Sequence, residues 1–174
     1  MANQPDYIVV SRDRDLRGRR GEVWVRRGVA GLLGVIPLLA LLNVFGQHAT
    51  TSKAAAQPAS IEVHAPPAVR MGLLFSARIT IHANETLQDA ALVLNSNWLE
   101  GMTLNTLEPS PVSETSQNGS LRLELGRMQA GQDFKVYLSF QVNPTTVAHR
   151  DQSVELVDGN RSVATVHRTM TIYP

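Results

Sequence analysis

The 174-residue sequence contains no cysteine, which removes several kinds of chemistry. Without thiols there is no disulfide framework, no thiolate zinc site, no iron–sulfur cluster and no cysteine nucleophile. Aromatic residues make up only 5% and charged residues 18% of the chain. A net charge of +1 argues against a general nucleic-acid binder, and 43% apolar residues argue against a disordered chain. The length suits about one domain with some additional chain.

Familiar catalytic motifs are also missing. The sequence has no G-x-S-x-G elbow, no H-E-x-x-H motif, no phosphate-binding glycine loop and no dinucleotide fingerprint. Serine, histidine and aspartate occur, but nothing in their spacing aligns them as a triad. The five histidines are too far apart for a short metal-ligand motif. A cross-strand metal pair of His82 and His167 is less favoured than two solvated histidines. We therefore predict a non-enzymatic protein without cofactor, metal or small-molecule substrate.

Charge divides the chain into three parts. Residues 1–27 hold seven arginines and a net charge of +3, residues 28–46 hold no charge, and residues 47–174 have a net charge of −2. The uncharged run spans roughly 28 Å as a helix, close to the ~30 Å apolar core of a bilayer. We predict a transmembrane helix over 28–46, with residues 1–27 cytoplasmic and the rest extracytoplasmic. The absence of cysteine in the exported part and the resemblance described below imply that this membrane is a bacterial inner membrane.

A cleaved signal peptide is the competing interpretation. The small residues Ala54, Ala55 and Ala56 could serve a peptidase, and the paired arginines have some likeness to a twin-arginine signal. However, the head of 27 residues is long, and the apolar run exceeds the usual ~7–15 residues of a signal peptide. An uncleaved anchor is therefore favoured.

Two sets of residues near this helix are candidates for contacts. Ala30, Gly34 and Pro37 share one helix face and could admit a second helix, while the amide of Asn43 lies on roughly the opposite face. The cytoplasmic side offers contacts to anionic headgroups or to an integral membrane complex through Arg19, Arg20, Trp24, Arg26 and Arg27. The plainer alternatives are that small residues and proline are common in membrane helices, and that the arginines only set the topology.

The remaining chain shows the alternation of β-strands. Residues 47–59 are small and polar and are predicted to form a tether. From residue 60 onward, apolar and polar residues alternate in about seven segments separated by turn signals. The best runs are Phe75–His82 and Phe134–Val142, and a return strand is expected over Ser162–Tyr173. This pattern predicts a mainly β fold, an antiparallel β-sandwich over 60–174. Its core is expected to include Trp98, Met102, Leu104 and Leu107.

Arg168 falls in the apolar phase of the expected return strand. A bulge or an edge position would explain it, and the sharper alternative is an inward arginine that binds a partner carboxylate. Three Asn-x-Ser/Thr sequons, at Asn84, Asn118 and Asn160, lie in expected loops, where asparagine is common without any glycan.

Several segments carry a resemblance to a known family. Gly126–Gln132, followed by Phe134–Val142 and Asn143-Pro144-Thr145, resembles the closing half of bacterial extracytoplasmic immunoglobulin-like modules. Trp98–Thr106 with Glu108–Pro111 is similar to small single-pass bacterial membrane proteins of unassigned function. The resemblance covers about residues 60–174 and implies an immunoglobulin-like sandwich that binds or braces other proteins. It implies no catalytic residue.

Two functions remain as hypotheses. The first is an accessory subunit that braces a larger membrane complex, such as a respiratory or photosynthetic one, and that should expose an apolar patch on a sheet face. The second is a stand-alone anchored module for an envelope protein or glycan, with a concave polar site near Asn95–Trp98 and Asn118.

Overall fold

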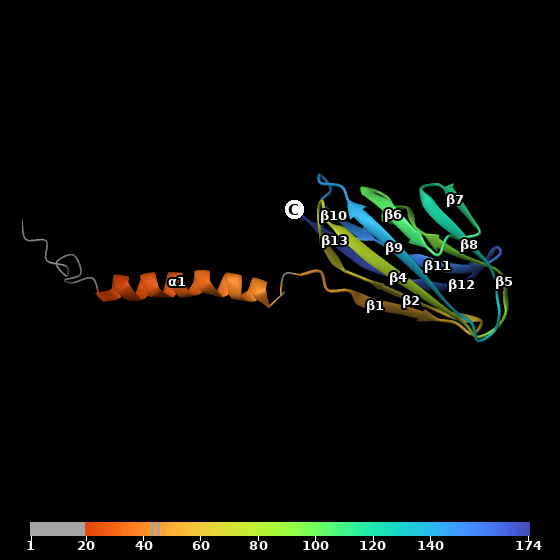
Figure 1. Cartoon of the computed structure of the whole chain (residues 1–174), viewed down its shortest axis with the longest axis horizontal. Coiled ribbons are helices and arrows are strands. Elements are labelled where there is room, and N and C mark those ends of the chain that lie inside the picture. The colour runs from red at the N-terminus through yellow and green to blue at the C-terminus, as the bar shows by residue number, and fades with distance from the viewer. Residues whose placement is uncertain (1–19, 43, 45) are drawn as a thin grey trace, which may run out of the picture. The chain divides into compact units, whose positions relative to one another are not determined.

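The computed structural model describes residues 20–42, 44 and 46–174. Within these residues, one α-helix precedes thirteen β-strands (Figure 1). The chain separates into two compact units, Met1–Gly46 and Gln47–Pro174. They are described one at a time below.

The helix α1 spans Arg20–Leu41 and contains Pro37. It starts eight residues before the predicted membrane span and ends before Gly46, so the predicted bounds of 28–46 describe the uncharged run rather than the helix. The reason is that Glu22, Trp24 and the arginines are compatible with helical structure even though they are polar or interfacial. The stretch Gly21–Leu41 is long and apolar enough to cross a membrane, a property that signal sequences share.

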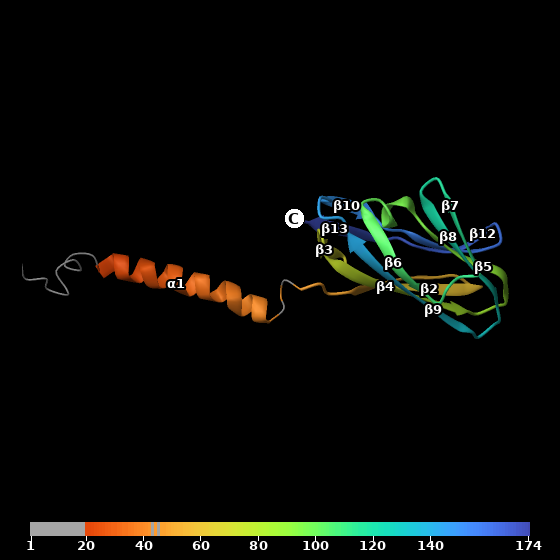
Figure 2. The ribbon, with the colours of Figure 1, turned by 45° about the horizontal axis from the view of Figure 1, so that its top comes forward.

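The second unit contains two five-stranded sheets and a smaller third sheet (Figures 1 and 2). The first sheet has the order β1 (Thr50–Ala55), β2 (Ala59–Ala65), β4 (Leu74–Ala83), β9 (Asp133–Val142) and β6 (Met102–Glu108). The second has the order β12 (Arg161–Val166), β11 (Val154–Asp158), β5 (Leu87–Leu94), β8 (Ser120–Met128) and β7 (Ser113–Gln117). The third has the order β10 (Ala148–Asp151), β13 (Thr169–Tyr173) and β3 (Ala68–Arg70).

All pairings in the two large sheets are antiparallel, and the parallel pairing of β13 with β3 belongs to the small sheet. The predicted mainly β fold with an antiparallel β-sandwich is therefore confirmed. The expected number of strands was too low. β3, β7 and β10 have three to five residues, which is too short to display an alternating pattern.

The tether predicted for residues 47–59 is wrong for its central part. Residues 50–55 form β1, which pairs with β2 from Thr50 opposite Ala65 to Ala55 opposite Ser60. The strand was missed because its side chains are small or polar and mostly exposed. Among the residues of β1, only Ala54 packs against the core. Ala56, which lies just after the strand, also packs against it. Backbone pairing with β2, rather than an apolar pattern, therefore makes this segment a strand.

The single return strand predicted over Ser162–Tyr173 is also wrong. The chain leaves the second sheet after Val166 and enters the small sheet at Thr169, so His167 and Arg168 lie between β12 and β13. The two strands share the same alternation, with Val166 and Met170 both buried. Because the alternation of buried and exposed residues continues from β12 into β13, the sequence gives little indication that the chain changes sheet.

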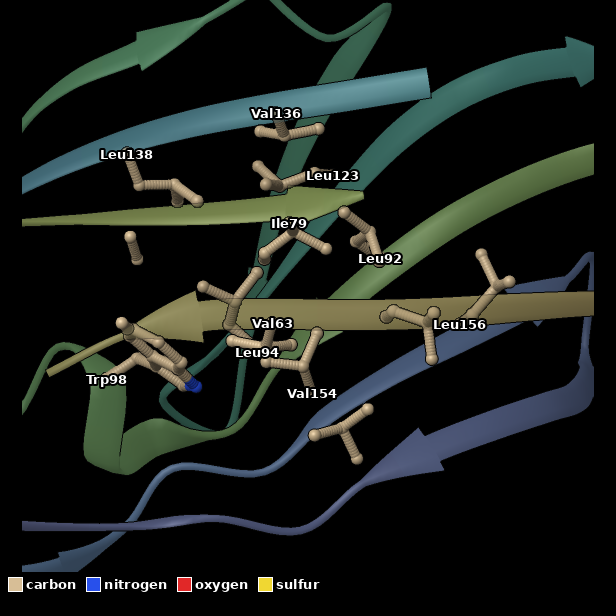
Figure 3. Packing of buried hydrophobic residues seen from close by; sticks show 14 of the residues in the cluster. Val63, Ile79, Leu92, Leu94, Trp98, Leu123, Val136, Leu138, Val154 and Leu156 are labelled. Carbon is tan, nitrogen blue, oxygen red and sulfur yellow. The ribbon is translucent and has the colours of Figure 1, made fainter. Parts of the chain in front are cut away.

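The core lies between the two large sheets (Figure 3). Alternate side chains of the long strands point inward, and the buried–partly buried pattern of β2 shows the same alternation. Figure 3 shows residues of the first sheet close to residues of the second: Val63, Ile79, Val136 and Leu138 with Leu92, Leu94, Leu123, Val154 and Leu156. As predicted, Trp98 and Met102 are buried, and Leu104 and Leu107 pack against the core.

Candidate functional site

The surface of α1 is apolar and open. Its large side chains Leu32, Leu33 and Ile36 are 54–67% exposed. A side chain added at Gly34 would meet no atom within 4 Å among the described residues, so the face that it shares with Ala30 and Pro37 is open within the first unit. Exposure of such an apolar surface to water is unfavourable, and a bilayer or contact with other protein would bury it. Contact of a second helix with this face remains a prediction.

The beginning of α1 combines an aromatic residue with arginines. Trp24 is 72% exposed, and the guanidinium carbon of Arg27 lies 5.7 Å from the centre of its ring. Arg26 is exposed one position earlier, and Arg20 is the first residue of the helix. A ring paired with a cation suits the polar boundary of a membrane. The candidates Arg19 and Asn43 lie outside the described residues.

Arg168 is buried, with only 7% of its surface exposed. Its guanidinium donates from Nη1 to the side-chain Oε1 of Gln152 at 2.8 Å, and from Nη2 to the backbone oxygens of Ala65 and Pro66 at 3.1 and 2.9 Å. The guanidinium carbon also lies 5.6 Å from the ring centre of Trp98. Burial lowers the pKa of Arg168 to about 10, so the group stays charged at neutral pH.

The prediction that Arg168 contacts a partner is therefore wrong. The arginine does point inward, but its hydrogen bonds go to an amide and two carbonyls of its own domain, and it is too buried to reach another protein. It joins the turn between β12 and β13 to the end of β2. This role depends on long-range pairing, and the sequence offers only the break in apolar phase as a signal.

Asp151, Ser153 and His167 come together near Arg168. The hydroxyl of Ser153 donates to Oδ1 of Asp151 at 2.7 Å and lies 3.2 Å from Nδ1 of His167. In a catalytic triad the carboxylate orients the histidine and the histidine accepts the serine proton. Here the single serine proton is directed at the carboxylate, so this arrangement does not produce a nucleophile.

The histidines of the sandwich are held by separate neighbours. Nδ1 of His82 lies 2.6 Å from Oδ1 of Asp133, on paired strands of the first sheet, whereas His167 contacts Ser153. The cross-strand metal pair considered for His82 and His167 therefore does not form. Among the described residues, no group of three or more histidine, aspartate or glutamate side chains could hold a metal ion.

A polar hollow of about 550 Å³ lies beside β7 and β8. It is lined by Asp89, Val112, Ser113, Arg122, Glu124, Gly126, Gly159 and Asn160. Arg122 is already engaged, because it donates to Oε1 of Glu124 at 2.5 Å and to the backbone oxygen of Gly159 at 2.9 Å. The hollow is not where a ligand site was expected. Trp98 is wholly buried and cannot line a groove with Asn118.

Large exposed apolar residues also occur at one end of the sandwich. They are Met71, Leu73, Leu74, Val147 and Tyr173, which are 36–59% exposed, and we call this set the apolar end. The backbone N–H of Met71 donates to the oxygen of Tyr173 at 2.8 Å, which joins the two segments. Val147 directly precedes Ala148, which pairs with Ile172 beside Tyr173.

Sequence reasoning missed the apolar end. Its members come from the turn between β3 and β4, from the start of β10 and from the end of β13, so they are far apart in the chain. The available signal was Met71-Gly72-Leu73-Leu74, in which apolar residues occupy a turn where polar ones are usual. The other large exposed apolar residues of the sandwich, Val112 and Tyr137, lie on other strands or loops.

Comparisons with known proteins add only weak similarities. No family model and no curated protein matches the chain. The CARDB domain of a Pyrococcus furiosus protein, crystallised with di-metal ions, is 10% identical with a TM-score of 0.40, over 66% of this chain and 92% of that one. CaCohA2 from Clostridium acetobutylicum is 14% identical with a TM-score of 0.42, over 64% of this chain and 90% of that one. The fold assignment rests on the sheets themselves.

Proposed function

We propose that the chain is a non-catalytic accessory subunit of a larger membrane complex in a bacterial inner membrane. In this proposal, α1 spans the bilayer and packs against the complex, with its arginine-rich start in the cytoplasm and the sandwich outside. The carrying observation is the open apolar surface of α1, on which Ala30, Gly34 and Pro37 share an uncovered face. Small residues leave a groove on the helix surface, and such a groove allows a second helix to approach closely.

The position of β1 supports an anchor over a cleaved signal peptide. The small residues that a peptidase could use, Ala54 to Ala56, belong to or follow β1. Ala54 and Ala56 pack against the core, and β1 pairs along its whole length with β2. Cleavage there would remove an edge strand from the first sheet and expose part of β2. Retention of the helix keeps the sheet complete.

A stand-alone anchored module for an envelope protein or glycan is the second candidate. The observation in its favour is the polar hollow beside β7 and β8. Against it, Arg122 and Glu124 bond to each other rather than pointing into the hollow as free groups. The exposed apolar residues of the sandwich gather at its end rather than on a sheet face, so α1 would supply the principal contact in the accessory role.

The test of the accessory role compares two matched glycine substitutions in α1. The C-terminally tagged full chain is purified in a gentle detergent and analysed by native gel and mass spectrometry. We expect stoichiometric co-migration with a membrane complex, loss of that complex in Gly34→Leu, and retention in Gly28→Leu. Gly28 lies about 120° around the helix from Gly34 and about 160° from Ala30, and both glycine positions have open space around them.

A monodisperse chain without any partner would contradict the accessory role and would move the anchored module to first place. Equal loss of the complex in both glycine variants would mean that the face of Ala30 and Gly34 is not the contact. Because leucine keeps the helix apolar, neither substitution should prevent membrane insertion.

A further inference from the structure

The apolar end lies at the end of the sandwich where the chain enters it. β1 begins at Thr50 opposite Ala65, where β2 ends, and β4 begins beyond this point at Leu74. The small sheet of β10, β13 and β3 gathers at the same end, next to the final residue (Figures 1 and 2). The opposite end is formed by turns such as that between β8 and β9, where Gly131 donates to the oxygen of Ala83.

The covalent connection keeps this end near the membrane. Eight residues, 42–49, separate the end of α1 from the start of β1. Even a fully extended chain covers about 3.3–3.6 Å per residue, so this connection reaches no more than about 30 Å. If α1 spans the bilayer, as the proposed function has it, the entry end of the sandwich stays within that distance of the lipid surface, whatever angle the domain takes.

The apolar end is held in a defined shape. The backbone N–H of Gly72 donates to the oxygen of Val142 at 3.1 Å, and that of Val142 donates to the oxygen of Leu73 at 3.0 Å, so this turn is fixed to the end of β9. The loop before Val147 is fixed by Gly101, whose oxygen accepts from the hydroxyl of Thr146 at 3.3 Å and from the backbone N–H of Asn143 at 3.0 Å. Because these loops are held in place by hydrogen bonds, their apolar side chains stay exposed. Packing within the domain therefore does not explain why these residues are apolar.

The charges around the apolar end suit an anionic lipid surface. Arg70 is exposed directly before Met71. The nearby carboxylate of Glu100 is neutralised by Arg150, with 2.7 Å between its Oε2 and the arginine Nη1. A cation near anionic headgroups and apolar side chains that reach the acyl boundary is the pattern of interfacial binding. Tyr173 adds an amphipathic ring of the kind that favours this boundary.

We propose that the apolar end, Met71, Leu73, Leu74, Val147 and Tyr173, inserts into the headgroup region of the bilayer that holds α1. The occupant is lipid rather than a protein, because the connection to α1 keeps this end within about 30 Å of the lipid surface and the exposed Arg70 beside it suits anionic headgroups. The sandwich then has a fixed orientation on the membrane, with the hollow beside β7 and β8 and the exposed faces of the sheets left for other contacts.

The absence of cysteine makes the test direct, because a single introduced thiol can be labelled without removing any native one. The matched variants are Val147→Cys in the apolar end and Val112→Cys beside the hollow, both at exposed valines. Each full-length variant is labelled with a polarity-sensitive fluorophore and reconstituted into vesicles of phosphatidylcholine and phosphatidylglycerol. Doxyl-labelled lipid then quenches any fluorophore within the headgroup and upper acyl region.

We expect a blue shift and several-fold stronger lipid quenching at position 147 than at position 112. Adding Leu73→Glu and Leu74→Glu to Val147→Cys should reduce quenching to the level of the Val112→Cys control. Both leucines are about half exposed, so the thermal unfolding of this variant should match its parent. Equal quenching at 147 and 112 would overturn the proposal. So would a blue shift that occurs in native membranes but not in pure lipid vesicles, which would assign the apolar end to a protein.

The same samples test the lipid contact of the apolar end separately from the membrane insertion of α1. Vesicle flotation reports membrane insertion of the full chain independently of the fluorophore. Flotation without preferential quenching at position 147 overturns the lipid contact and leaves the anchor intact. A chain that does not float overturns both, because the argument for the lipid contact rests on α1 spanning the bilayer.

Discussion

At the scale of single residues, Arg168 is the side chain with the largest expected effect on stability. Its guanidinium donates hydrogen bonds to one side-chain amide oxygen and two backbone oxygens, and it packs over the ring of Trp98. Removing it would leave the oxygens of Ala65 and Pro66 without this donor in a buried place, and unpaired buried acceptors are costly. Its neighbour Gln152 is wholly buried and would lose the same contact.

We therefore expect Arg168→Ala to lower the free energy of unfolding by about 2–4 kcal/mol. The matched control Arg161→Ala, at an exposed position, should change it by less than about 0.5 kcal/mol. Chemical denaturation monitored by tryptophan fluorescence gives both values. Similar stability of the two variants would mean that the hydrogen bonds of Arg168 contribute little.

The pH dependence of the Arg168→Ala effect follows from its pKa. Burial lowers the pKa of Arg168 in the folded chain to about 10, so the unfolded chain holds the proton more tightly. Proton binding by this group therefore changes the stability only above about pH 9, where the unfolded state binds more protons and the free energy of unfolding rises with pH. Below pH 9 both states are charged, and the loss in Arg168→Ala should be the same at pH 6 and pH 8.

At the scale of elements, β1 depends on backbone pairing and on one ion pair. Nζ of Lys53 lies 2.7 Å from Oε2 of Glu62 on the neighbouring strand β2. The hydrogen bond from Lys53 is the main cause that lowers the pKa of Glu62 below 4.5. A carboxyl with a lowered folded pKa stabilises the fold above its unfolded pKa, and the contribution disappears as the pH falls through the folded pKa.

Glu62→Gln should therefore weaken the attachment of β1 at neutral pH but not in acid. Both side chains are largely solvent-accessible, so the expected loss is only a few tenths of a kcal/mol. Hydrogen exchange of the β1 amides is the suitable measurement, because an edge strand opens locally before the sandwich unfolds. Faster exchange in the variant at pH 7, and equal exchange in both proteins near pH 3, is the expected result. A difference that persists in acid would argue against the ion pair as its cause.

The long strands were predictable, and the short ones were not. β4 and β9 have ten residues each, and their buried positions alternate strictly or nearly so, which the sequence displays directly. β7 has no apolar residue and β1 contributes only Ala54 to the core, so the pairing of both strands is determined by neighbouring strands. The same distinction applies to the surfaces. The open face of α1 could be read from a local pattern, whereas the apolar end and the contacts of Arg168 depend on segments brought together by the sheets.

At the scale of the whole chain, charge and apolar surface support one topology. The arginines that precede the uncharged run favour a cytoplasmic start, and Trp24 with Arg27 suits the boundary on that side. The sandwich has a separate core that includes no residue of α1 among those described. An anchor that stays attached would therefore hold a complete domain outside the membrane.

This topology predicts how one exposed position is labelled in intact cells. In the C-terminally tagged Val112→Cys variant, a membrane-impermeant maleimide should react without lysis, because Val112 is 77% exposed and the proposed topology places the sandwich outside the membrane. The labelled chain should have its full mass of 19.0 kDa plus the tag and label, and it should be released from membranes by detergent but not by alkaline carbonate. Labelling only after lysis would contradict the orientation. A labelled product that begins near residue 57 would contradict the anchor, and since it would lack β1, it should also unfold at a lower temperature than the intact chain.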